Sequence, residues 1–375
     1  MHRGTNGHRA VGPAGRRVRV MASPLVIGML ADGPGLGPDS PVARSAQLRI
    51  DRENAQGGIA GRELQLVVEV ADGAHEGLPE HLVTAWRRLA ERRDVLGVIG
   101  PAITDNVLVL VDAVAAGGMP TLHWAGTEHA RGEWYFQFQV GSLTDEGPAL
   151  VDALLADGHR RVGVLTAGTV GDEYFESFLR EAQIRGLQLV GLDRAHIQQD
   201  DVTEELDRLR VNGPDAVVFL GMAAPGDAFV RGTGRPGWDV PRYGNIALFS
   251  AIGMPDVAEG LVWVDQYEPE NVVLQDAVGA YVEAYGPIPP MWVHFIGWDM
   301  ATLMIEGLRR APNLSRTGLK QGLERVRQVP CATGGRAPVM GFGHVDRAAI
   351  KGPDLLMYRT IRDGKPVSYH PGSTR

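Results

Sequence analysis

Residues 51–73, DRENAQGGIAGRELQLVVEVADG, decide the fold, because a helical pattern in them gives way abruptly to a strand pattern. Apolar residues recur at helical spacing over 43–50, and leucines and valines alternate with other residues over 63–70. Between the two patterns, Gly57-Gly58 predicts a sharp helix stop with positive φ, and Gly61 predicts a second tight corner. A helix that ends sharply and feeds a strand is half of a β-α-β unit.

Outward from this unit, strand-like and helical segments alternate along most of the chain. Five strand-like runs in each half, with helical patterns between most of them, predict an α/β fold with two Rossmann-like lobes and mainly parallel sheets. The apolar strand runs indicate sheets that are covered on both faces. The expected strands are 24–30, 64–70, 95–100, 119–125, 135–141, 161–167, 187–193, 215–221, 241–247 and 260–266. The expected helices are 41–55, 78–92, 104–116, 145–157, 172–185 and 202–211.

The last hundred residues break this alternation. They hold two strongly amphipathic helical segments, NVVLQDAVGAYVEAYG and HFIGWDMATLMIEGLRRA, a third in SRTGLKQGLERVRQV, and a hairpin with an Asp-Gly turn in DLLMYRTIRDGKPV. The helices need a surface to cover, and we expect it to be the first lobe, so the chain crosses between the lobes several times. The expected first lobe is 24–140 plus 267–340, and the second is 141–266 plus 341–375.

Composition excludes several classes of function. The chain has 375 residues, 44% hydrophobic and 22% charged, with a net charge of -8, and no basic cluster that would favour a nucleic-acid partner. One cysteine, Cys331, permits no intramolecular disulfide, and its loop has no adjacent histidine to make a catalytic thiol. Walker A, H-E-x-x-H, G-x-S-x-G and spaced Cys/His patterns are absent, so we expect no cofactor and no metal.

The first twenty residues carry five arginines and no apolar run, so they lack the core of a secretory signal. Residues 1–23 are expected to be a disordered extension, and the protein, as written, to be cytoplasmic. A start misassigned upstream of Met21 leaves export as the alternative. No segment approaches the length of about 18 apolar residues that a membrane helix needs, so no membrane insertion is expected.

Several segments occur in an order that resembles a known family: PLVIGML, ARSAQLRIDRENAQGGIAGRELQLVVEVADG, VIGPAITDN, MPTLHWAGT, YFQFQVGSLTDEGPAL and, near the end, GFGHVDRAAIKGPDLLMYRTIRDGK. They resemble the type I periplasmic-binding-protein fold, in the branched-chain amino-acid (Leu/Ile/Val) branch of the solute receptors of ABC transporters. The resemblance implies three hinge crossings, a ligand between the lobes, and a structural role for the glycines of 57–61. It also implies a non-catalytic protein with an ABC permease as a possible partner.

The resemblance and the residues together nominate a ligand site. In the family, the loops that match GPAITDN and the segment after the fourth strand hold the carboxylate of the ligand, which nominates Ile103, Thr104, Ala125 and Thr127. His123, Trp124 and Tyr267 stand at predicted strand ends and hinges, where side chains of either core or ligand-contact type occur.

The departures from the family bear on the ligand. Amino-acid binders hold the ammonium group with an acid in the second lobe, whereas the matching places here read GMAAPGD and NIALFS and offer Met222 and Ala247. An unpaired ammonium in a closed site costs several kcal/mol, so the expected ligand is a hydrophobic aromatic or steroid-like carboxylate. Three alternatives stay open. They are a branched-chain amino-acid binder, an amide-sensor-like cytoplasmic sensor that acts through a regulatory partner, and an enzyme using Asp32, His123 or Asp265; the protein is expected to be a monomer or a homodimer.

Overall fold

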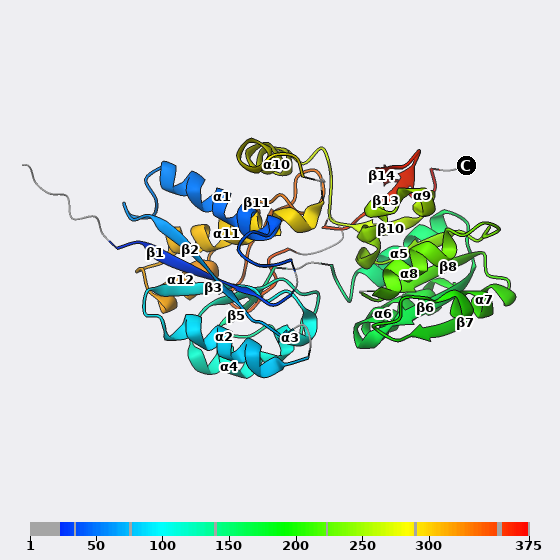
Figure 1. Cartoon of the computed structure of the whole chain (residues 1–375), viewed down its shortest axis with the longest axis horizontal. Helices are drawn as coiled ribbons and strands as arrows, with labels where there is room; N and C mark the ends of the chain where they lie inside the picture. The colour runs from blue at the N-terminus through cyan, green and yellow to red at the C-terminus, as the bar shows by residue number, and fades with distance from the viewer. Residues whose placement is uncertain are drawn as a thin grey trace, which may run out of the picture.

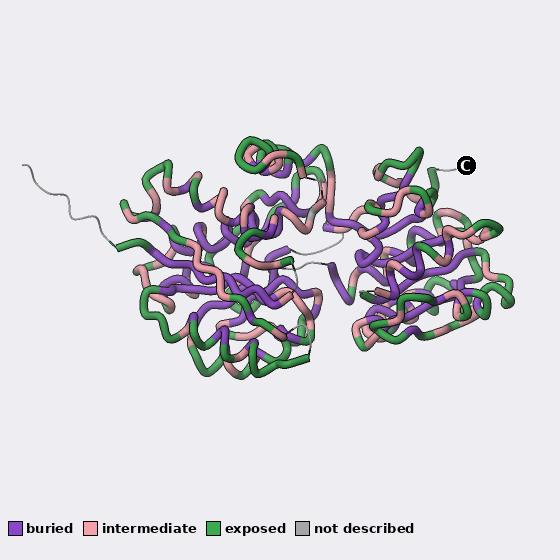
Figure 2. The backbone as a smooth tube through the Cα atoms, in the orientation of Figure 1, coloured by how far each residue is buried: buried purple, intermediate pink, exposed green. Residues whose placement is uncertain are grey.

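The computed structural model describes residues 23–33, 35–74, 77–138, 141–222, 224–288, 291–350 and 355–373. The described chain forms two α/β lobes that lie side by side (Figure 1), as the sequence predicts. Buried residues concentrate in the middle of each lobe (Figure 2). Except for Ser23, the extension expected over residues 1–23 lies outside the described residues.

The first lobe contains a parallel five-stranded sheet in the order β2-β1-β3-β4-β5. One apolar cluster lies between the sheet and α1, α11 and α12, and a second lies under α2 and α4, so both faces are covered. The strands are β1 Leu25–Ala31, β2 Leu64–Val70, β3 Val95–Ile99, β4 Thr121–His123 and β5 Tyr135–Gln137, and β11 Val329–Pro330 pairs with β12 Val339–Met340. The helices are α1 Pro41–Ala55, α2 Pro79–Glu91, α3 Thr104–Val109, α4 Val111–Gly117, α10 Val272–Tyr285, α11 Trp292–Arg310 and α12 Arg316–Leu323.

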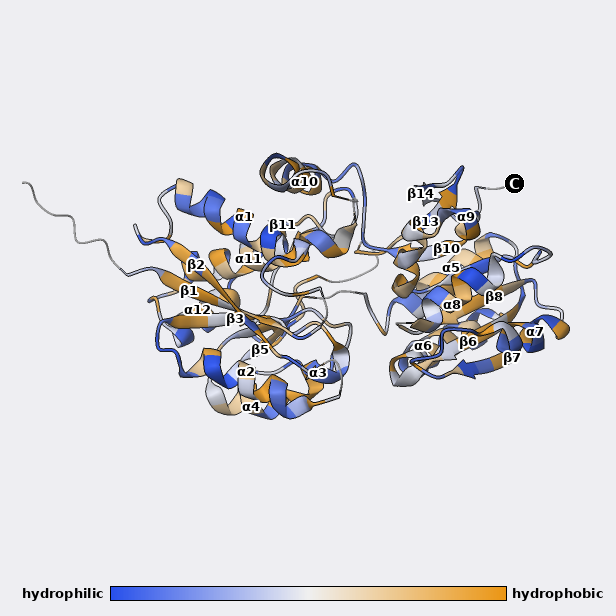
Figure 3. Cartoon of the chain, viewed as in Figure 1, coloured by the Kyte–Doolittle hydropathy of each residue, from blue (hydrophilic) through white to orange (hydrophobic). Residues whose placement is uncertain are grey.

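The second lobe contains a seven-stranded sheet in the order β14-β13-β10-β9-β8-β6-β7. Apolar residues of this sheet and of the helices around it form two buried clusters, and the same helices also carry hydrophilic residues (Figure 3). The strands are β6 Arg161–Ala167, β7 Gln188–Ala195, β8 Ala216–Leu220, β9 Arg242–Gly244, β10 Val262–Asp265, β13 Met357–Arg362 and β14 Lys365–Tyr369. The helices are α5 Glu146–Ala156, α6 Gly168–Arg185, α7 Thr203–Val211, α8 Ala224–Thr233, the 3-10 helix η2 Ile246–Gly253 and α9 Pro255–Ala258.

The glycine corner between α1 and β2 forms as predicted. Gly57, Gly58 and Gly61 have φ values of 102°, 66° and 74°. A Cβ on Gly58 would lie 2.0 Å from the carbonyl oxygen of Arg62, so this position admits only glycine. The side-chain amide of Asn54 then accepts from the N–H of Leu64 at 2.7 Å and donates to its carbonyl at 2.9 Å, which fixes where the new strand begins.

The tail helices cover the first lobe, and the tail hairpin joins the second. Helices α11 and α12 supply core residues to the same apolar cluster as α1. Strand β13 pairs antiparallel with β10, and Asp363 and Gly364 turn it into β14 with φ values of 53° and 69°.

Several predicted boundaries are wrong. The strands expected over 119–125, 135–141 and 241–247 shrink to β4, β5 and β9, because the chain leaves each sheet for a connecting segment. The helix expected over 104–116 bends at Leu110. Helix α8 was not predicted, since Pro225 and Gly226 look like helix breakers, although a proline is tolerated in the first turn.

The described chain passes between the lobes three times. Phe138 belongs to the first-lobe cluster and Gly141 precedes α5 of the second lobe, Asp265–Tyr267 lead back from β10, and Leu355 of the first-lobe cluster precedes β13 of the second lobe. The expected third crossing, after residue 340, is too early, because Leu355 still belongs to the apolar cluster of the first lobe. Residues 341–350 stay with the first lobe because the Arg347 side chain donates to Glu324 at 2.6 Å, and the Arg347 carbonyl accepts from the backbone of β5.

The Gly58 corner provides a direct test of this chain reversal. We expect Gly58→Ala to lower the free energy of unfolding by about 3 kcal/mol or more, since it adds a steric clash to the cost of positive φ. Gly61→Ala, with a similar φ and open space around it, should cost only about 1–2 kcal/mol. Urea denaturation of both variants measures the difference; equal losses would contradict the clash.

Candidate functional site

The carboxyl ends of the parallel strands of both lobes face the junction between them. Strand β5 leads directly into the first crossing and β10 into the second, and the other parallel strands of each sheet end on the same edge (Figure 1). Ligands of open α/β sheets bind beyond this edge. The candidate site is therefore the set of segments that follow these strands.

A buried carboxylate holds two of these segments together in the first lobe. Asp32 follows β1 and accepts from the backbone N–H groups of Ala102 and Ile103, each at 2.9 Å, and from the side chain of Asn106 at 3.0 Å. Burial raises the pKa of Asp32, and these donors oppose the rise. The Ile103 amide is thus occupied by Asp32, and a ligand contact by Ile103 stays a prediction, whereas Thr104, the first residue of α3, is half-buried.

His123 ends β4 and is fully buried inside the first lobe. Its ring packs edge-on against Tyr135, and its Nδ1 lies 3.4 Å from the N–H of Ala125. Burial, together with the positive charge of Arg131, lowers the pKa of His123 to about 3, so the ring is neutral. Its Nε2 is buried without a partner in the described part of the chain. A ligand contact by His123 stays a prediction.

The loop after β4 is held by one glutamine. The side-chain amide of Gln137 donates to the carbonyls of Ala125 at 2.8 Å and Thr127 at 2.9 Å, and its oxygen accepts from Arg131. The Thr127 hydroxyl accepts from the N–H of His129 at 3.3 Å and is buried. Ala125 and Thr127 are therefore brought together, in a loop that is already rigid.

Apolar side chains of both lobes meet at the junction. Trp124 is only 5% exposed and belongs to one contiguous apolar cluster with Phe138 from the first crossing and Ile246 from the second lobe. Phe249 and Tyr267 pack against the same cluster. A ligand contact by Trp124 stays a prediction.

In the second lobe, the predicted apolar surface is smaller than expected. Met222, after β8, is 38% exposed, but Ala247 is mostly buried, and Leu248 is fully buried in the core of its own lobe. The cause is η2, which turns these residues inward. Asn245, just before η2, exchanges hydrogen bonds with the backbone of Gly221 and so joins the ends of β8 and β9.

A second buried carboxylate organises the entry into the second lobe. Glu146, at the start of α5, accepts from the N–H groups of Ser142 and Ile246, each at 2.7 Å, and from the Tyr174 hydroxyl at 3.2 Å. Burial raises the pKa of Glu146 to about 7, while these hydrogen bonds oppose the rise. The side chain is fully buried and already has its partners, so it is not positioned to receive a ligand's ammonium group.

Several hydrogen bonds hold the second crossing in place. The Gln266 side-chain oxygen accepts from Gly141 N–H at 2.8 Å, and the Gln266 carbonyl accepts from Gly334 N–H at 2.8 Å. Asp265 is buried and accepts from the Trp263 indole and from the backbone of Gln266. Burial raises the pKa of Asp265 to about 6, and the charge of Arg359 opposes this.

Tyr267 follows directly and is half-buried. The Arg359 guanidinium lies 4.9 Å from the centre of its ring. The backbone of Tyr267 also forms a bridge with Gly334 of the first lobe. Tyr267 therefore stands on a hinge crossing, as predicted.

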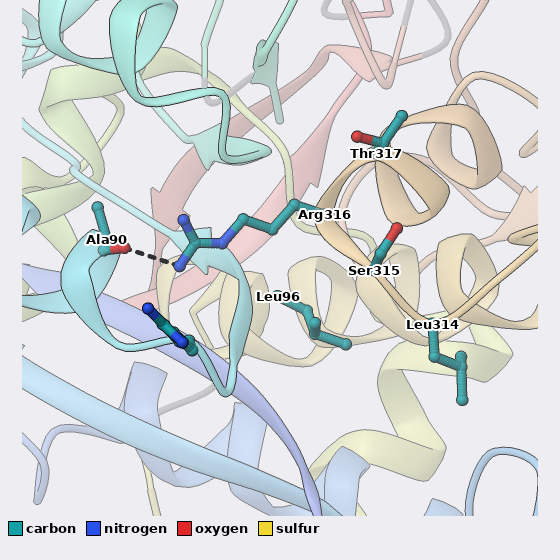
Figure 4. A pocket seen from close by; sticks show the side chains of 7 residues that line it. Ala90, Leu96, Leu314, Ser315, Arg316 and Thr317 are labelled. Atoms are coloured by element: carbon teal, nitrogen blue, oxygen red, sulfur yellow. Dashed lines mark hydrogen bonds between the residues drawn. The ribbon is translucent and has the colours of Figure 1, made fainter.

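Two surface pockets lie elsewhere. One, of about 430 Å³, is lined by Leu96, Leu314 and Arg316 at the start of β3, which is the opposite edge of the sheet from the junction. The Arg316 guanidinium donates hydrogen bonds to the carbonyls of Ala90, Arg92 and Val95, and Figure 4 shows the bond to Ala90. The other, of about 450 Å³, is lined by Ile59, Leu308 and neighbouring residues. The first lies at the start of α12, the second lies between the glycine corner after α1 and the end of α11, and neither is lined by a nominated ligand residue.

The described residues contain no group of three or more His, Cys, Asp or Glu side chains that could hold a metal ion. Cys331 is buried, and burial raises the pKa of its thiol well above the usual value, which is the opposite of what a reactive thiolate needs. In the same part of the chain, no helix is long and apolar enough to cross a membrane.

Two α/β lobes joined by three crossings, with both carboxyl edges turned to the junction, define a type I binding-protein fold. Residues 24–350 match the family model described as periplasmic binding protein, and the chain belongs to this family. A search of curated proteins found no significant match.

Solved structures share the fold at low sequence identity. A type 1 periplasmic binding protein from Bordetella pertussis is 20% identical, with a TM-score of 0.79, and covers 92% of this chain and 99% of its own. An ABC transporter substrate-binding protein from Desulfitobacterium hafniense, solved in complex with Leu, is 21% identical, with a TM-score of 0.78, and covers 93% and 100%. A leucine-binding protein from Thermotoga maritima is 18% identical, with a TM-score of 0.73, and covers 92% and 98%.

The sequence did not predict the residues whose buried side chains hold the segments of the site in place by hydrogen bonds. Asn245, Gln266 and Glu146 each bridge segments far apart in the chain. Asp299 of α11 does the same, accepting from Ala332 and Thr333 N–H at 2.8 Å, and burial raises its pKa to about 7. The only sequence pattern that indicates a special role for Asp299 is its position as an acid among the apolar residues of a helix.

The buried Glu146 predicts a specific pH dependence. Its native pKa of about 7 exceeds the ordinary value of 4.5, so its contribution to stability is fully present below pH 4.5 and is lost as pH rises through about 7. Glu146→Gln removes this titration, so the wild-type advantage over the variant in unfolding free energy should shrink from pH 4.5 to pH 8.

Urea denaturation at several pH values measures this difference. The exposed Glu176→Gln on α6 serves as the control, and its curve should run parallel to that of the wild type. A Glu146→Gln curve that also runs parallel to the wild type would show that Glu146 does not titrate in this window.

Proposed function

We propose that this protein is a non-catalytic solute receptor of the ABC-transporter type, which closes its two lobes over a small hydrophobic carboxylate. Family membership and the paired carboxyl edges support a ligand between the lobes. The observation that carries the ligand class is the apolar cluster of Trp124, Phe138 and Ile246, which spans both lobes at the junction.

The junction favours apolar surface on the ligand. Tyr267 and Phe249 flank the cluster, and Met222 exposes its flexible thioether at the end of β8. Burial of apolar ligand surface yields about 25 cal/mol per Å². An aromatic or steroid-like body suits such surroundings.

The acidic end of the ligand is assigned to the first lobe. Thr104 is the first residue of α3 and offers its side-chain hydroxyl as a donor. The side chain of Gln137 holds the loop of Ala125–Thr127, which follows β4. Each hydrogen bond to a carboxylate contributes about 1.5–3 kcal/mol.

An α-amino acid needs a carboxylate for its ammonium group. The buried acids around the junction, Asp32, Glu146 and Asp265, already accept hydrogen bonds from the backbone. Displacing those partners leaves buried N–H groups unpaired, at about 1–3 kcal/mol each. The relatives solved with leucine or named for it make a branched-chain amino acid the second candidate.

The same arrangement argues against catalysis. A general base needs a free carboxylate or imidazole within reach of a substrate. The carboxylates of Asp32 and Asp265 accept hydrogen bonds from backbone N–H groups, and the imidazole of His123 is neutral and buried. The proposed receptor works instead by hinge closure, which converts binding into a shape that a permease recognises.

Calorimetry with a ligand panel tests the ligand class. Phenylacetate, indole-3-acetate and cholate represent hydrophobic carboxylates, and leucine, isoleucine and valine represent the alternative. At least one hydrophobic acid should bind about tenfold or more tightly than any of the three amino acids, a difference of about 1.4 kcal/mol. Micromolar binding of leucine, with no response to the acids, would overturn the proposed class.

Substitutions at the junction test its location. Trp124→Ala should weaken the tightest acid by about tenfold or more, since it removes a large apolar surface. Trp238→Ala is the matched control, because Trp238 precedes β9 on the opposite edge of the second sheet. Trp86 is unsuitable as a control, since it is 2% exposed and bonds to Thr121 inside the first lobe.

Both proteins are checked by thermal melting before titration, and Tyr267→Ala, on the half-buried hinge tyrosine, repeats the test if Trp124→Ala does not fold. Unchanged affinity in Trp124→Ala and Tyr267→Ala would place the ligand elsewhere.

A further inference from the structure

The two large sheets of the described chain have four edge strands, and three of these are closed to further pairing. Strand β5 is covered by residues 347–349, whose backbone exchanges hydrogen bonds with Gln137 on both sides. Strand β14 carries Pro366, whose carbonyl accepts from the Arg359 side chain. Strand β7 has a register break against β6 and carries the charged pair Asp193-Arg194.

Strand β2, Leu64–Val70, is the fourth edge. In the described chain it has no covering strand, no proline and no register break, and its one charged residue is Glu69. Its register with β1 is unbroken over seven residues, and it contains no proline or glycine. Its sequence, LQLVVEV, has high strand propensity, and Val70 is 40% exposed. A long, flat, apolar edge of this kind is a template for another strand.

The backbone groups that β2 turns outward can be assigned. The carbonyl of Glu63 accepts from Leu25, and the N–H of Ala71 donates to Ala31, so the odd-numbered residues pair with β1. The even-numbered residues face away from the sheet. Asn54 takes both outward groups of Leu64, in the manner of a neighbouring strand. Among the described residues, the outward N–H and C=O groups of Leu66, Val68 and Val70 have no hydrogen-bond partner.

These three residues are complementary to themselves. In an antiparallel pair centred on Val68, Leu66 lies opposite Val70 of a second copy, Val68 lies opposite Val68, and all three residues exchange backbone hydrogen bonds. The side chains of this row are all apolar, and the pairing covers Val70.

The opposite face of the same pair contains no repulsion. Glu69 of one copy lies opposite Val67 of the other, and Glu69 is neutralised within its own chain by Arg88 at 2.8 Å. No like charges stand directly across from each other in this register.

We infer that β2 is a dimerisation edge, where a second copy of this chain adds its own β2 antiparallel about Val68 and joins the two first-lobe sheets into one. The occupant is a second copy because the free backbone row, its apolar side chains and its charges match the same row turned by a two-fold axis. The edge is independent of the ligand site, which lies at the carboxyl ends of the strands.

Sedimentation velocity of the full chain over a wide range of concentration tests this inference. The wild type should form dimers, and Val70→Lys, which places a charge in the apolar row, should weaken dimerisation at least tenfold. Val282→Lys is the matched control, because Val282 is 43% exposed on α10, and it should dimerise like the wild type.

Val68→Pro is the second variant. It removes an outward N–H that the β1 ladder does not use, so it should also give monomers. Because Val68 packs partly against the first-lobe cluster, thermal melting first confirms that the variant is folded. A wild type that stays monomeric at every concentration would overturn the inference. A dimer that survives in both folded Val70→Lys and Val68→Pro would overturn it as well, since its interface would lie elsewhere.

Discussion

The side-chain amide of Gln266 ties the two lobes together. The side-chain oxygen of Gln266 accepts from the N–H of Gly141 on the first crossing, and the backbone carbonyl of Gln266 accepts from the N–H of Gly334 in the first lobe. The whole residue is buried. A chain that passes three times between two lobes would otherwise leave these N–H groups unpaired, at about 1–3 kcal/mol each. This tie joins the first two crossings directly to each other and to the first lobe.

The same solution recurs wherever a loop leaves a strand end. Asp32, Glu146 and Asp299 are each buried, and each accepts from two backbone N–H groups that no strand or helix can satisfy. A carboxylate suits this task because its two oxygens can serve two donors at once. Desolvation is the cost, and it raises the pKa of Glu146 and Asp299 to about 7. Acids that accept backbone hydrogen bonds in this way fix the loops around the site and are not free to contact a ligand.

Local signals predicted most of the fold. The glycine corner after α1, the helix-strand alternation and the Asp-Gly hairpin depend on residues close in sequence, so they could be read directly. Strand ends at the crossings could not, because tertiary pairing decides where β4, β5 and β9 stop. The third crossing was misplaced because nothing local indicates that Arg347 binds Glu324.

The candidate site was less accessible from the sequence. Its general position follows from topology, and Tyr267 stands on a crossing as expected. The orientation of single side chains did not follow: η2 turns Leu248 into its own lobe, and Asp32 occupies the Ile103 amide. Gln266 and Asn245 gave no signal, since their partners lie more than 20 residues away in the chain.

A crystal structure of the protein with its tightest-binding hydrophobic acid tests the central claim most directly. The expected structure holds the ligand between the two lobes, with its apolar body against Tyr267 and Met222 and its carboxylate toward Thr104. A ligand seated beside Arg316 on the far edge of the first sheet would contradict it, as would a bound amino acid whose ammonium group is held by a second-lobe carboxylate.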